Sequence, residues 1–342
     1  MIGSSGLGNI KRKAVTVSQE KLVNEACLQD GAMLPLVIQP AVDGINIEHW
    51  ARQEREGIER RLRRHGALLF RNFNILTAER FARFLAAVTD NVIEYRERSS
   101  PRSQIRDKVY TSTDYPSDQH IFLHNEHSYS KTFPLTLFFG CTRAAREGGE
   151  TPLADTRRVI RHISPKIRER FAEKKWMYVR NFGDGFGLPW QTVFQTTERA
   201  AVENYCRRAR VEYEWKGGNR LKTRQVRPAT AKHPRTGETL WFNHITFFHI
   251  STLEARVREA LQAEFRDEDL PNNTYYGDGS PIEASVMDEL REAYKREMVT
   301  FQWQDGDAVI LDNMMAAHGR QPYAGPREVM FSMAEPYTRA DL

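Results

Sequence analysis

The sequence is poor in cysteine and has no long hydrophobic run. Its 342 residues include three cysteines, Cys27, Cys141 and Cys206, and none of them forms a CxxC pair. This usage argues against a disulfide framework and a structural zinc site, and it is typical of a reducing cytoplasm. No apolar stretch approaches the roughly 20 residues that a membrane-spanning helix needs. The basic N-terminus has no apolar run behind it, so we expect a cytoplasmic protein without a signal peptide.

The sequence also lacks internal repeats and low-complexity blocks. Hydrophobic residues make up 40% and charged residues 28%, the balance of a folded protein. The net charge of +5 is mild, and no helix-turn-helix, zinc finger or basic-aromatic pattern is present, so we expect no nucleic-acid partner. Nothing marks a domain boundary. We therefore predict a single domain over residues 1–342, with a mobile N-terminal arm over residues 1–30.

Strand-like segments dominate the middle of the chain, and helical segments lie mainly at its edges. Apolar spacing and capping residues predict helices over 47–64, from Thr77 onward, and over 164–175, 253–265 and 283–298. Apolar runs between turn residues predict strands over 35–38, 67–73, 135–140, 299–303, 307–311 and 329–334. Residues 101–119 are predicted to form a loop. This order favours an antiparallel barrel or sandwich with helices packed on its outside over a regular βαβ alternation.

One stretch near the middle of the chain carries a metal-binding pattern. An apolar run from Ile121 leads into His124, Asn125 and Glu126. In an extended strand the side chains at positions i and i+2 project from the same face, so His124 and Glu126 are expected to point together. An imidazole and a carboxylate are two of the three ligands of a 2-His-1-carboxylate site for Fe(II).

A third ligand and a carboxylate-binding group come from the end of the sequence. A Gly-Asp turn feeds the apolar strand 307–311, and a short loop then presents His318. Arg327 enters the last strand, where its guanidinium can hold a carboxylate through a bidentate pair. Thr151, after the turn at Gly148-Gly149, offers a hydroxyl to a second carboxylate oxygen.

The remaining histidines are expected to be structural. The charged helical context of His49, His65 and His162 gives them no role. His127, on the opposite strand face from Glu126, is expected to pack inside the protein or to contact a metal ligand. His244 and His249 are expected in the core or in a cleft, because a lone histidine is more often structural than a ligand. Arg320 competes with Arg327 as the carboxylate clamp, but its position beside His318 favours another direction.

The order of these motifs resembles a known family. His-x-Glu, Gly-Gly-Glu-Thr, Gly-Asp-x-x-x-x-Asp-Asn, His and Arg follow one another as in the taurine dioxygenase (TauD/TfdA) superfamily of Fe(II)/2-oxoglutarate oxygenases. Further motifs resemble its SyrP-like branch, the amino-acid hydroxylases of nonribosomal peptide pathways. These are His124-Asn125-Glu126, Glu147 to Pro152, His233 to Glu238, Trp241-Phe242-Asn243 and Tyr275 to Pro281. The similarity covers residues 65–336.

The resemblance implies a fold, a ligand set and co-substrates. The fold would be a double-stranded β-helix, a jelly roll with the metal at its mouth. The iron ligands would be His124, Glu126 and His318. Arg327 and Thr151 would bind 2-oxoglutarate, and dioxygen would be the second co-substrate. Asn125, Phe242 and Asn243 would line the substrate cleft.

Two departures from the family pattern narrow the expected reaction. Residues 329–332 contain no second arginine, so taurine is not expected as the substrate. The carboxylate ligand is Glu126 in place of the commoner Asp, as in the clavaminate-synthase-like relatives that act on amino acids, and the relatives that halogenate lack a carboxylate ligand altogether. We therefore expect hydroxylation of an amino acid, at its β-carbon, in nonribosomal peptide or related secondary metabolism.

Two alternatives stay open for the reaction, and two for the form of the substrate. The protein would be a desaturase or cyclase on the same substrates, or a non-catalytic regulator. The substrate would be free or held as a thioester on a peptidyl carrier protein. The basic runs 59–64 and 206–210 are solvated helix faces or the surface that such an acidic carrier meets.

Overall fold

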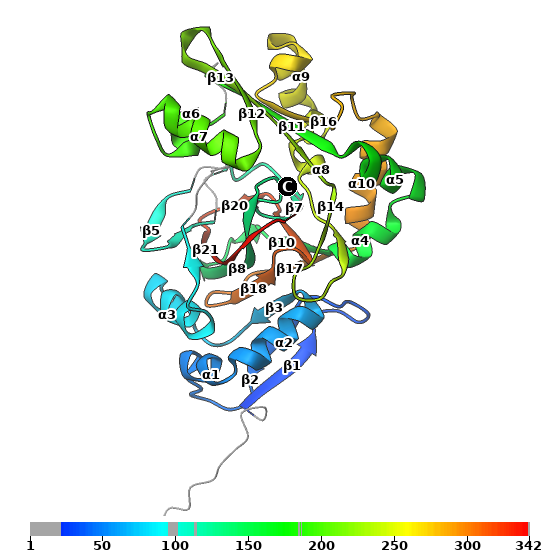
Figure 1. Cartoon of the computed structure of the whole chain (residues 1–342). Coiled ribbons are helices and arrows are strands. Elements are labelled where there is room, and N and C mark those ends of the chain that lie inside the picture. The colour runs from blue at the N-terminus through cyan, green and yellow to red at the C-terminus, as the bar shows by residue number, and fades with distance from the viewer. Residues whose placement is uncertain (1–21, 95–101, 113–114, 184, 186, 341–342) are drawn as a thin grey trace, which may run out of the picture.

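Two β-sheets that share one hydrophobic core form the centre of the molecule (Figure 1). This computed structural model describes residues 22–94, 102–112, 115–183, 185 and 187–340. Within them, the larger sheet contains, in spatial order, β1 (Val23–Cys27), β2 (Leu36–Pro40), β3 (Ala67–Phe70), β18 (Ala308–Asp312), β8 (Thr132–Arg143), β21 (Glu328–Thr338), β6 (Val109–Thr111) and β5 (Gln104–Arg106), with β4 (Val92–Ile93) paired to β21. The smaller sheet contains β17 (Met298–Phe301), β10 (Thr151–Asp155), β19 (Ala316–Arg320) and β7 (Ile121–His124).

The two faces of the larger sheet are buried against different partners. Neighbouring residues of a strand point to opposite faces. Accordingly, Phe138 of β8 joins the core beneath the helices, whereas Leu137 and Phe139 join the core between the two sheets. Both faces are therefore apolar, which explains why β8 is an almost continuous apolar run. The paired sheets with helices outside confirm the predicted jelly-roll class.

Three helices cover the outer face of the larger sheet, at the bottom of Figure 1. They are α1 (Ile47–Gln53), α2 (Arg55–His65) and α3 (Ala78–Val88). The predicted helix over 47–64 is in fact two helices, because the backbone at Glu54 leaves helical geometry. Asn46 caps the start of α1, since its side chain accepts a hydrogen bond from the backbone N–H of His49, and Gly66, with a φ of 78°, ends α2.

A third sheet lies at the top of the molecule in Figure 1, and the remaining helices lie around it and beside the smaller sheet. The sheet contains β12 (Glu212–Lys216), β13 (Arg220–Arg227), β11 (Trp176–Phe182) and β16 (Asn272–Tyr276). Two short pairs are β14 (Thr230–Lys232) with β15 (Thr239–Trp241) and β9 (Glu147–Gly148) with β20 (Tyr323–Ala324). The helices are α4 (Thr156–His162), α5 (Pro165–Lys174), α6 (Trp190–Phe194), α7 (Arg199–Ala209), α8 (Ile245–Phe248), α9 (Ala255–Glu264) and α10 (Ala284–Arg296).

Two expectations about irregular segments need correction. Residues 1–21 of the predicted mobile arm lie outside the described residues, but residues 23–27 form β1 and pair with β2. Within the predicted loop over 101–119, β5 and β6 extend the larger sheet beyond β21. No helix in the described part of the chain is long and apolar enough to cross a membrane.

Candidate metal centre

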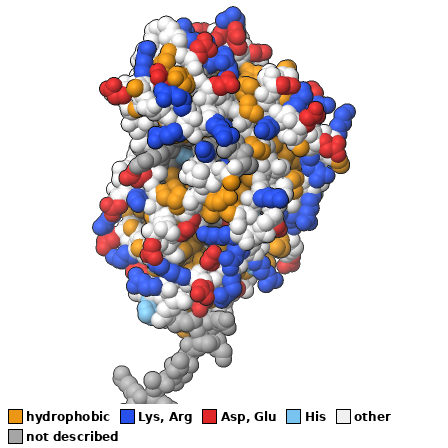
Figure 2. Space-filling view, in the orientation of Figure 1, with side chains coloured by type: hydrophobic (Ala, Val, Ile, Leu, Met, Phe, Trp, Pro, Cys, Tyr) orange, Lys and Arg blue, Asp and Glu red, His pale blue; other side chains and the backbone are white. Residues whose placement is uncertain are grey.

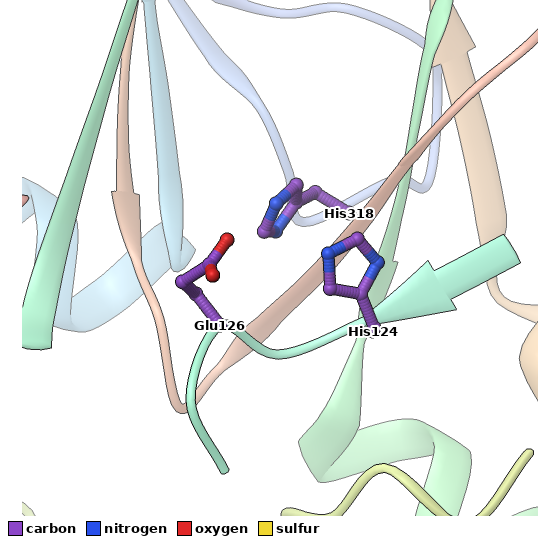
Figure 3. Close-up of side chains that lie close together, drawn as sticks. All are labelled: His124, Glu126 and His318. Atoms are coloured by element: carbon purple, nitrogen blue, oxygen red, sulfur yellow. The ribbon is translucent and has the colours of Figure 1, made fainter. Parts of the chain in front are cut away.

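His124, Glu126 and His318 converge on one point at the mouth of the jelly roll (Figure 3). His124 is the last residue of β7, and His318 is its direct cross-strand partner in β19. One ligand atom from each of the three side chains lies within 4.8 Å of the other two. All three residues are buried, with relative exposures of 9%, 2% and 5% in chain order. The structure therefore brings together the three ligands that the sequence predicted.

Glu126 reaches this point by a route that the sequence analysis did not predict. β7 ends at His124, and Glu126 lies in the turn that follows, where His127 has a φ of 56°. His127 does not face away from Glu126, because its Nε2 lies 3.6 Å from Oε1 of that carboxylate. Alternation of side chains along a strand thus predicts the right pair but the wrong backbone geometry for Glu126.

Asn313, the last residue of the Gly-Asp-x-x-x-x-Asp-Asn motif, was given no role from the sequence, but it holds the turn in place. Its Oδ1 accepts from the backbone N–H of Glu126 at 2.8 Å, and its Nδ2 donates to the backbone oxygens of Glu126 and Pro134 at 2.8 Å each. Its own backbone oxygen accepts from Nδ2 of Asn125 at 2.7 Å. Asn313 follows β18 directly, so one side chain fixes the turn of Glu126 against the strands that lead to His318.

Arg102 was also missed, because it lies in a segment expected to be a loop. Its Nη2 donates to Oε2 of Glu126 at 2.8 Å, and its guanidinium lies 3.7 Å from the centre of the Phe331 ring. The side chains of Arg102 and Glu126 are 5% and 2% exposed, respectively. No spacing or motif in the sequence pointed to this pair.

The electrostatics of the three side chains suit a metal. Burial lowers the pKa of His124, and it lowers that of His318 well below the ordinary value, so both imidazoles are neutral near pH 7. Burial alone would raise the pKa of Glu126, but this pKa is lowered, chiefly by the positive charge of Arg102. Two neutral imidazoles and one carboxylate are the protonation states that a divalent metal requires.

Hydrogen bonding at the rings also fits a metal. Nδ1 of His124 lies 2.9 Å from the backbone oxygen of Phe122, which directs its other nitrogen toward the centre. Nδ1 of His318 is buried, and no described residue bonds to it. A ring nitrogen left in this state is costly unless a further group satisfies it. The residues present therefore fit an Fe(II) ion bound by two histidines and one carboxylate.

A cavity of about 460 Å³ opens onto the three side chains. Its walls include apolar side chains, polar side chains and three arginines. The lining includes Arg102, Phe122, His124, Glu126, Phe139, Thr151, Phe247, Glu254, His318, Arg320 and Arg327. The centre is thus accessible to a small molecule while its ligands stay buried, as in most small-molecule sites.

Arg327 and Thr151 both lie in this cavity. Nε of Arg327 donates to the backbone oxygen of Gly149 at 3.2 Å, and burial together with the charge of Arg320 lowers the pKa of Arg327 to about 10. Gly149 has a φ of 74°, and a Cβ atom there would lie 3.1 Å from Cδ of Arg327. The hydroxyl of Thr151 accepts from Nε1 of Trp303 at 2.9 Å. The turn at Gly148-Gly149 therefore lets Arg327 pack closely beside β10, the strand that begins at Thr151.

Arg320 lines the same cavity but is occupied elsewhere. Its guanidinium donates to the backbone oxygens of Tyr115 at 3.0 Å, Gln119 at 2.9 Å and Pro116. It therefore holds the segment 115–119 at the edge of the cavity. This arrangement agrees with the expectation that Arg320 points away from the role given to Arg327.

His244 is buried in the core and His249 is partly buried, and both lie outside the ligand set, as expected. Nδ1 of His244 lies 2.5 Å from Oγ of Ser128, and burial lowers the pKa of His244 well below the usual value. Its ring centre is 5.5 Å from that of His124. Neither histidine belongs to a possible metal-binding group among the described residues.

The three residues expected to line the substrate cleft are buried in the protein instead. Asn125 is fully buried and donates to the backbone of Asn313. Phe242 packs against Phe133, with ring centres 4.7 Å apart. Asn243 donates to the backbone oxygen of Ala229 and accepts from Ile245. None of the three lines the cavity, so their assignment to the substrate cleft was wrong.

Comparisons with known proteins agree with this geometry. The model of a family described as "Taurine catabolism dioxygenase TauD, TfdA family" matches residues 31–333. The dapdiamide synthesis protein DdaC of Enterobacter agglomerans is 39% identical over 279 residues, which cover 82% of this chain and 85% of that protein. A clavaminate synthase-like protein of Arabidopsis thaliana is 27% identical over 287 residues, covering 80% and 83% of the two chains.

Solved structures share the fold. The PvcB protein of Pseudomonas aeruginosa superposes with a TM-score of 0.55 at 15% identity, over 96% of this chain and 95% of that one. AAD-2, solved with Mn(II) and N-oxalylglycine, gives a TM-score of 0.51 at 14% identity, over 91% and 96% of the chains. The family match covers most of the sequence and agrees with the convergent ligand set. The chain therefore belongs to the TauD/TfdA family and is a non-haem dioxygenase that uses Fe(II), 2-oxoglutarate and dioxygen.

Proposed function

We propose that this dioxygenase hydroxylates an amino acid, at its β-carbon, in the biosynthesis of a specialised metabolite. The observation that carries the proposal is the cavity that His124, Glu126 and His318 line together with Arg327 and Thr151. The metal site and the 2-oxoglutarate site would then lie at one end, with room left for a small substrate. The relative named for dapdiamide synthesis supports a biosynthetic role.

The metal ligands, Arg327 and Thr151 would each have one of two roles, binding the metal or binding 2-oxoglutarate. The two histidines and Glu126 hold the metal, while Arg327 pairs with the distal carboxylate of 2-oxoglutarate and Thr151 contacts the same group. Iron, 2-oxoglutarate and dioxygen together supply an oxidant that replaces a C–H hydrogen with hydroxyl, and succinate and carbon dioxide are released. The apolar walls exclude water from the reacting carbon.

The outer part of the cavity supports an amino-acid substrate. Glu254 lines the cavity and is exposed, so its carboxylate is available to an ammonium group. Phe122 and Phe247 provide aromatic walls for a side chain or an acyl group. An amine with an apolar part satisfies both kinds of surface. A panel of amino acids, offered both free and as carrier-protein thioesters, tests whether the carboxyl group of the substrate is free or joined to a carrier protein.

A nucleic-acid-binding regulator is less well supported. On the face shown in Figure 2, Lys and Arg side chains are interspersed with Asp and Glu side chains. The basic runs on α2 and α7 are partly neutralised, because Arg61 pairs with Glu25 and Glu54, and Arg207 lies 3.7 Å from Glu203. A charge pattern of this kind gives little attraction to a polyanion.

The experiment has two stages. Protein reconstituted with Fe(II) without oxygen should develop the weak metal-to-ligand absorption band when 2-oxoglutarate is added, and H318A should not. Oxygen is then admitted with a panel of amino acids, offered free and as carrier-protein thioesters. We expect one substrate to gain the mass of one oxygen atom, with one succinate formed for each product.

The possible products separate the alternatives. A substrate that loses two hydrogens in place of gaining oxygen identifies a desaturase or cyclase and contradicts hydroxylation. If no member of the panel raises succinate formation above the level without substrate, the amino-acid proposal is wrong. Turnover of the thioester but not of the free amino acid identifies a carrier protein as the partner.

A further inference from the structure

The carboxylate of Glu126 has a different environment at each oxygen. Oε2 accepts a hydrogen bond from Nη2 of Arg102 at 2.8 Å, whereas Oε1 lies 3.6 Å from Nε2 of His127. The pair with Arg102 is almost completely buried. Charge-assisted hydrogen bonds are the strong ones in proteins, and in a buried site water does not compete for them. Oε2 is therefore engaged by the protein itself.

The position of the Arg102 guanidinium is fixed by an aromatic surface. The guanidinium lies 3.7 Å from the centre of the Phe331 ring in β21. Phe331 packs against Phe139 of β8 with ring centres 5.0 Å apart, and Phe139 packs against His318 at 5.2 Å. Two core aromatics thus support both Arg102 and one of the metal ligands, so the arginine and the histidine are held in a defined relation to each other.

The number of open metal positions depends on how Glu126 binds. An octahedral ion held by two histidines and one carboxylate oxygen would keep three positions open, enough for a bidentate 2-oxoglutarate and for dioxygen. If both carboxylate oxygens bind, only two positions stay open, and 2-oxoglutarate fills them. An enzyme of this class therefore needs a device that keeps its carboxylate ligand to one oxygen.

We propose that Arg102 is this device, a positioning residue that holds Oε2 of Glu126 and leaves one carboxylate oxygen for the metal. The role rests on the proposed metal site, but it depends neither on the identity of the substrate nor on the reaction catalysed. The flat guanidinium lies against Phe331 and donates to Oε2 at the same time. A lysine ammonium lacks this planar geometry.

The test uses Mn(II), whose affinity and bound waters are measured without oxygen, 2-oxoglutarate or substrate. The affinity is obtained from the free-ion electron paramagnetic resonance signal, and the bound waters are counted by pulsed resonance in ¹⁷O-labelled water. We expect three exchangeable waters on the wild type and two on R102M. The dissociation constant should rise about 10- to 100-fold in R102M, the usual effect of removing a group that orients a metal ligand.

R102K separates positioning from simple charge neutralisation and also covers the case in which R102M does not fold. It keeps the positive charge, so we expect an affinity between those of the wild type and R102M, but still two waters. The control is R61M on α2, which removes partly buried ion pairs to Glu25 and Glu54 outside the cavity. R61M should lower the melting temperature and leave both Mn(II) measurements unchanged.

The outcomes distinguish this role from the proposed function. Three waters on R102M or on R102K overturn the positioning role, whatever the change in affinity. A wild type that binds no Mn(II) overturns the metal site and this role together. Failure to find a hydroxylated amino acid contradicts the proposed reaction but leaves the measurements on Mn(II) valid.

Discussion

At the scale of single residues, three arginines share one cavity and each has a different partner. Arg102 donates to Glu126, and Arg320 donates to three backbone oxygens. Within the described residues, Arg327 uses only Nε, toward Gly149. Its terminal nitrogens are therefore available to a ligand carboxylate, which supports the proposal that Arg327, and neither of the other two arginines, binds 2-oxoglutarate.

We expect R327M to weaken the binding of 2-oxoglutarate about 10- to 100-fold, because a hydrogen bond to a charged group contributes roughly 1.5 to 3 kcal/mol. The measurement is an anaerobic titration of the metal-to-ligand absorption band with 2-oxoglutarate. R327K keeps the positive charge without the bidentate geometry, so its affinity for 2-oxoglutarate should lie between those of the wild type and R327M. Affinity for Mn(II) alone should not change. An unaltered 2-oxoglutarate affinity in R327M would show that the clamp lies elsewhere.

At the scale of elements, the metal centre depends on a contact between distant segments. The turn of Glu126 is held by Asn313, 187 residues away in the sequence. Asp312 beside it accepts from the backbone N–H groups of Met314 and Met315, and Nε2 of His233 lies 2.9 Å from its Oδ2. The link from β18 to β19 is therefore fully hydrogen-bonded, and it positions both Glu126 and His318.

This dependence explains which parts of the site could be predicted. His124, Glu126 and His318 were found because their residue types and order are specific. The turn at Glu126 was not found, because local sequence alone favours continuing the strand and only the contact with Asn313 stops it. Arg102 was missed for the same reason, since its partner lies 24 residues away and no periodicity links them.

We predict that N313A lowers the free energy of unfolding by about 3 kcal/mol or more, because it leaves buried backbone groups of Glu126 and Pro134 unsatisfied. It should also weaken Mn(II) binding, since the turn loses its support. Denaturant unfolding and a Mn(II) titration measure the two effects. The matched control is N181A, in which another asparagine loses hydrogen bonds to the backbone oxygens of Glu268 and Leu270, outside the cavity.

N181A should reduce stability without a change in metal affinity. If N313A destabilises the protein about as much as N181A does and binds Mn(II) as tightly as the wild type, Asn313 stabilises the fold without positioning Glu126. N313D keeps the size of the side chain but places a carboxylate oxygen against two backbone oxygens. It should therefore bind metal less well than the wild type.

At the scale of the whole molecule, the fold class was predictable because strand-like runs filled the middle of the chain and helical ones its edges. The structural details that were predicted wrongly are those that depend on packing between distant segments. The helix predicted over 47–64 divides at Glu54, and residues 23–27 add β1 to the edge of the larger sheet. The residues expected in the substrate cleft, Asn125, Phe242 and Asn243, pack into the protein and do not line the cavity. The single-domain organisation over residues 1–342 stays a prediction.

The packing of the outer layer predicts how stability depends on pH. His249 lies between α8 and the short 3₁₀ helix Ile250–Thr252, and its Nδ1 accepts a hydrogen bond from the backbone N–H of Ser251 at 3.2 Å. Burial, together with the charge of Arg291, lowers the pKa of His249 from 6.5 to about 4. Between these two values the unfolded chain binds more protons than the folded one, so stability falls as the pH falls through this window.

The linked loss between pH 6.5 and 4 is at most about 3 kcal/mol for this one group, at 1.36 kcal/mol for each pH unit of the difference. H249N removes the titrating group, so we expect its free energy of unfolding to decline less steeply over this range than that of the wild type. Denaturant unfolding at a series of pH values measures both slopes. H49N, at an exposed position on α1, is the control and should retain the wild-type slope. Equal slopes for H249N and the wild type would mean that His249 is protonated as readily in the folded protein as in the unfolded chain, and that this layer opens to solvent before the core unfolds.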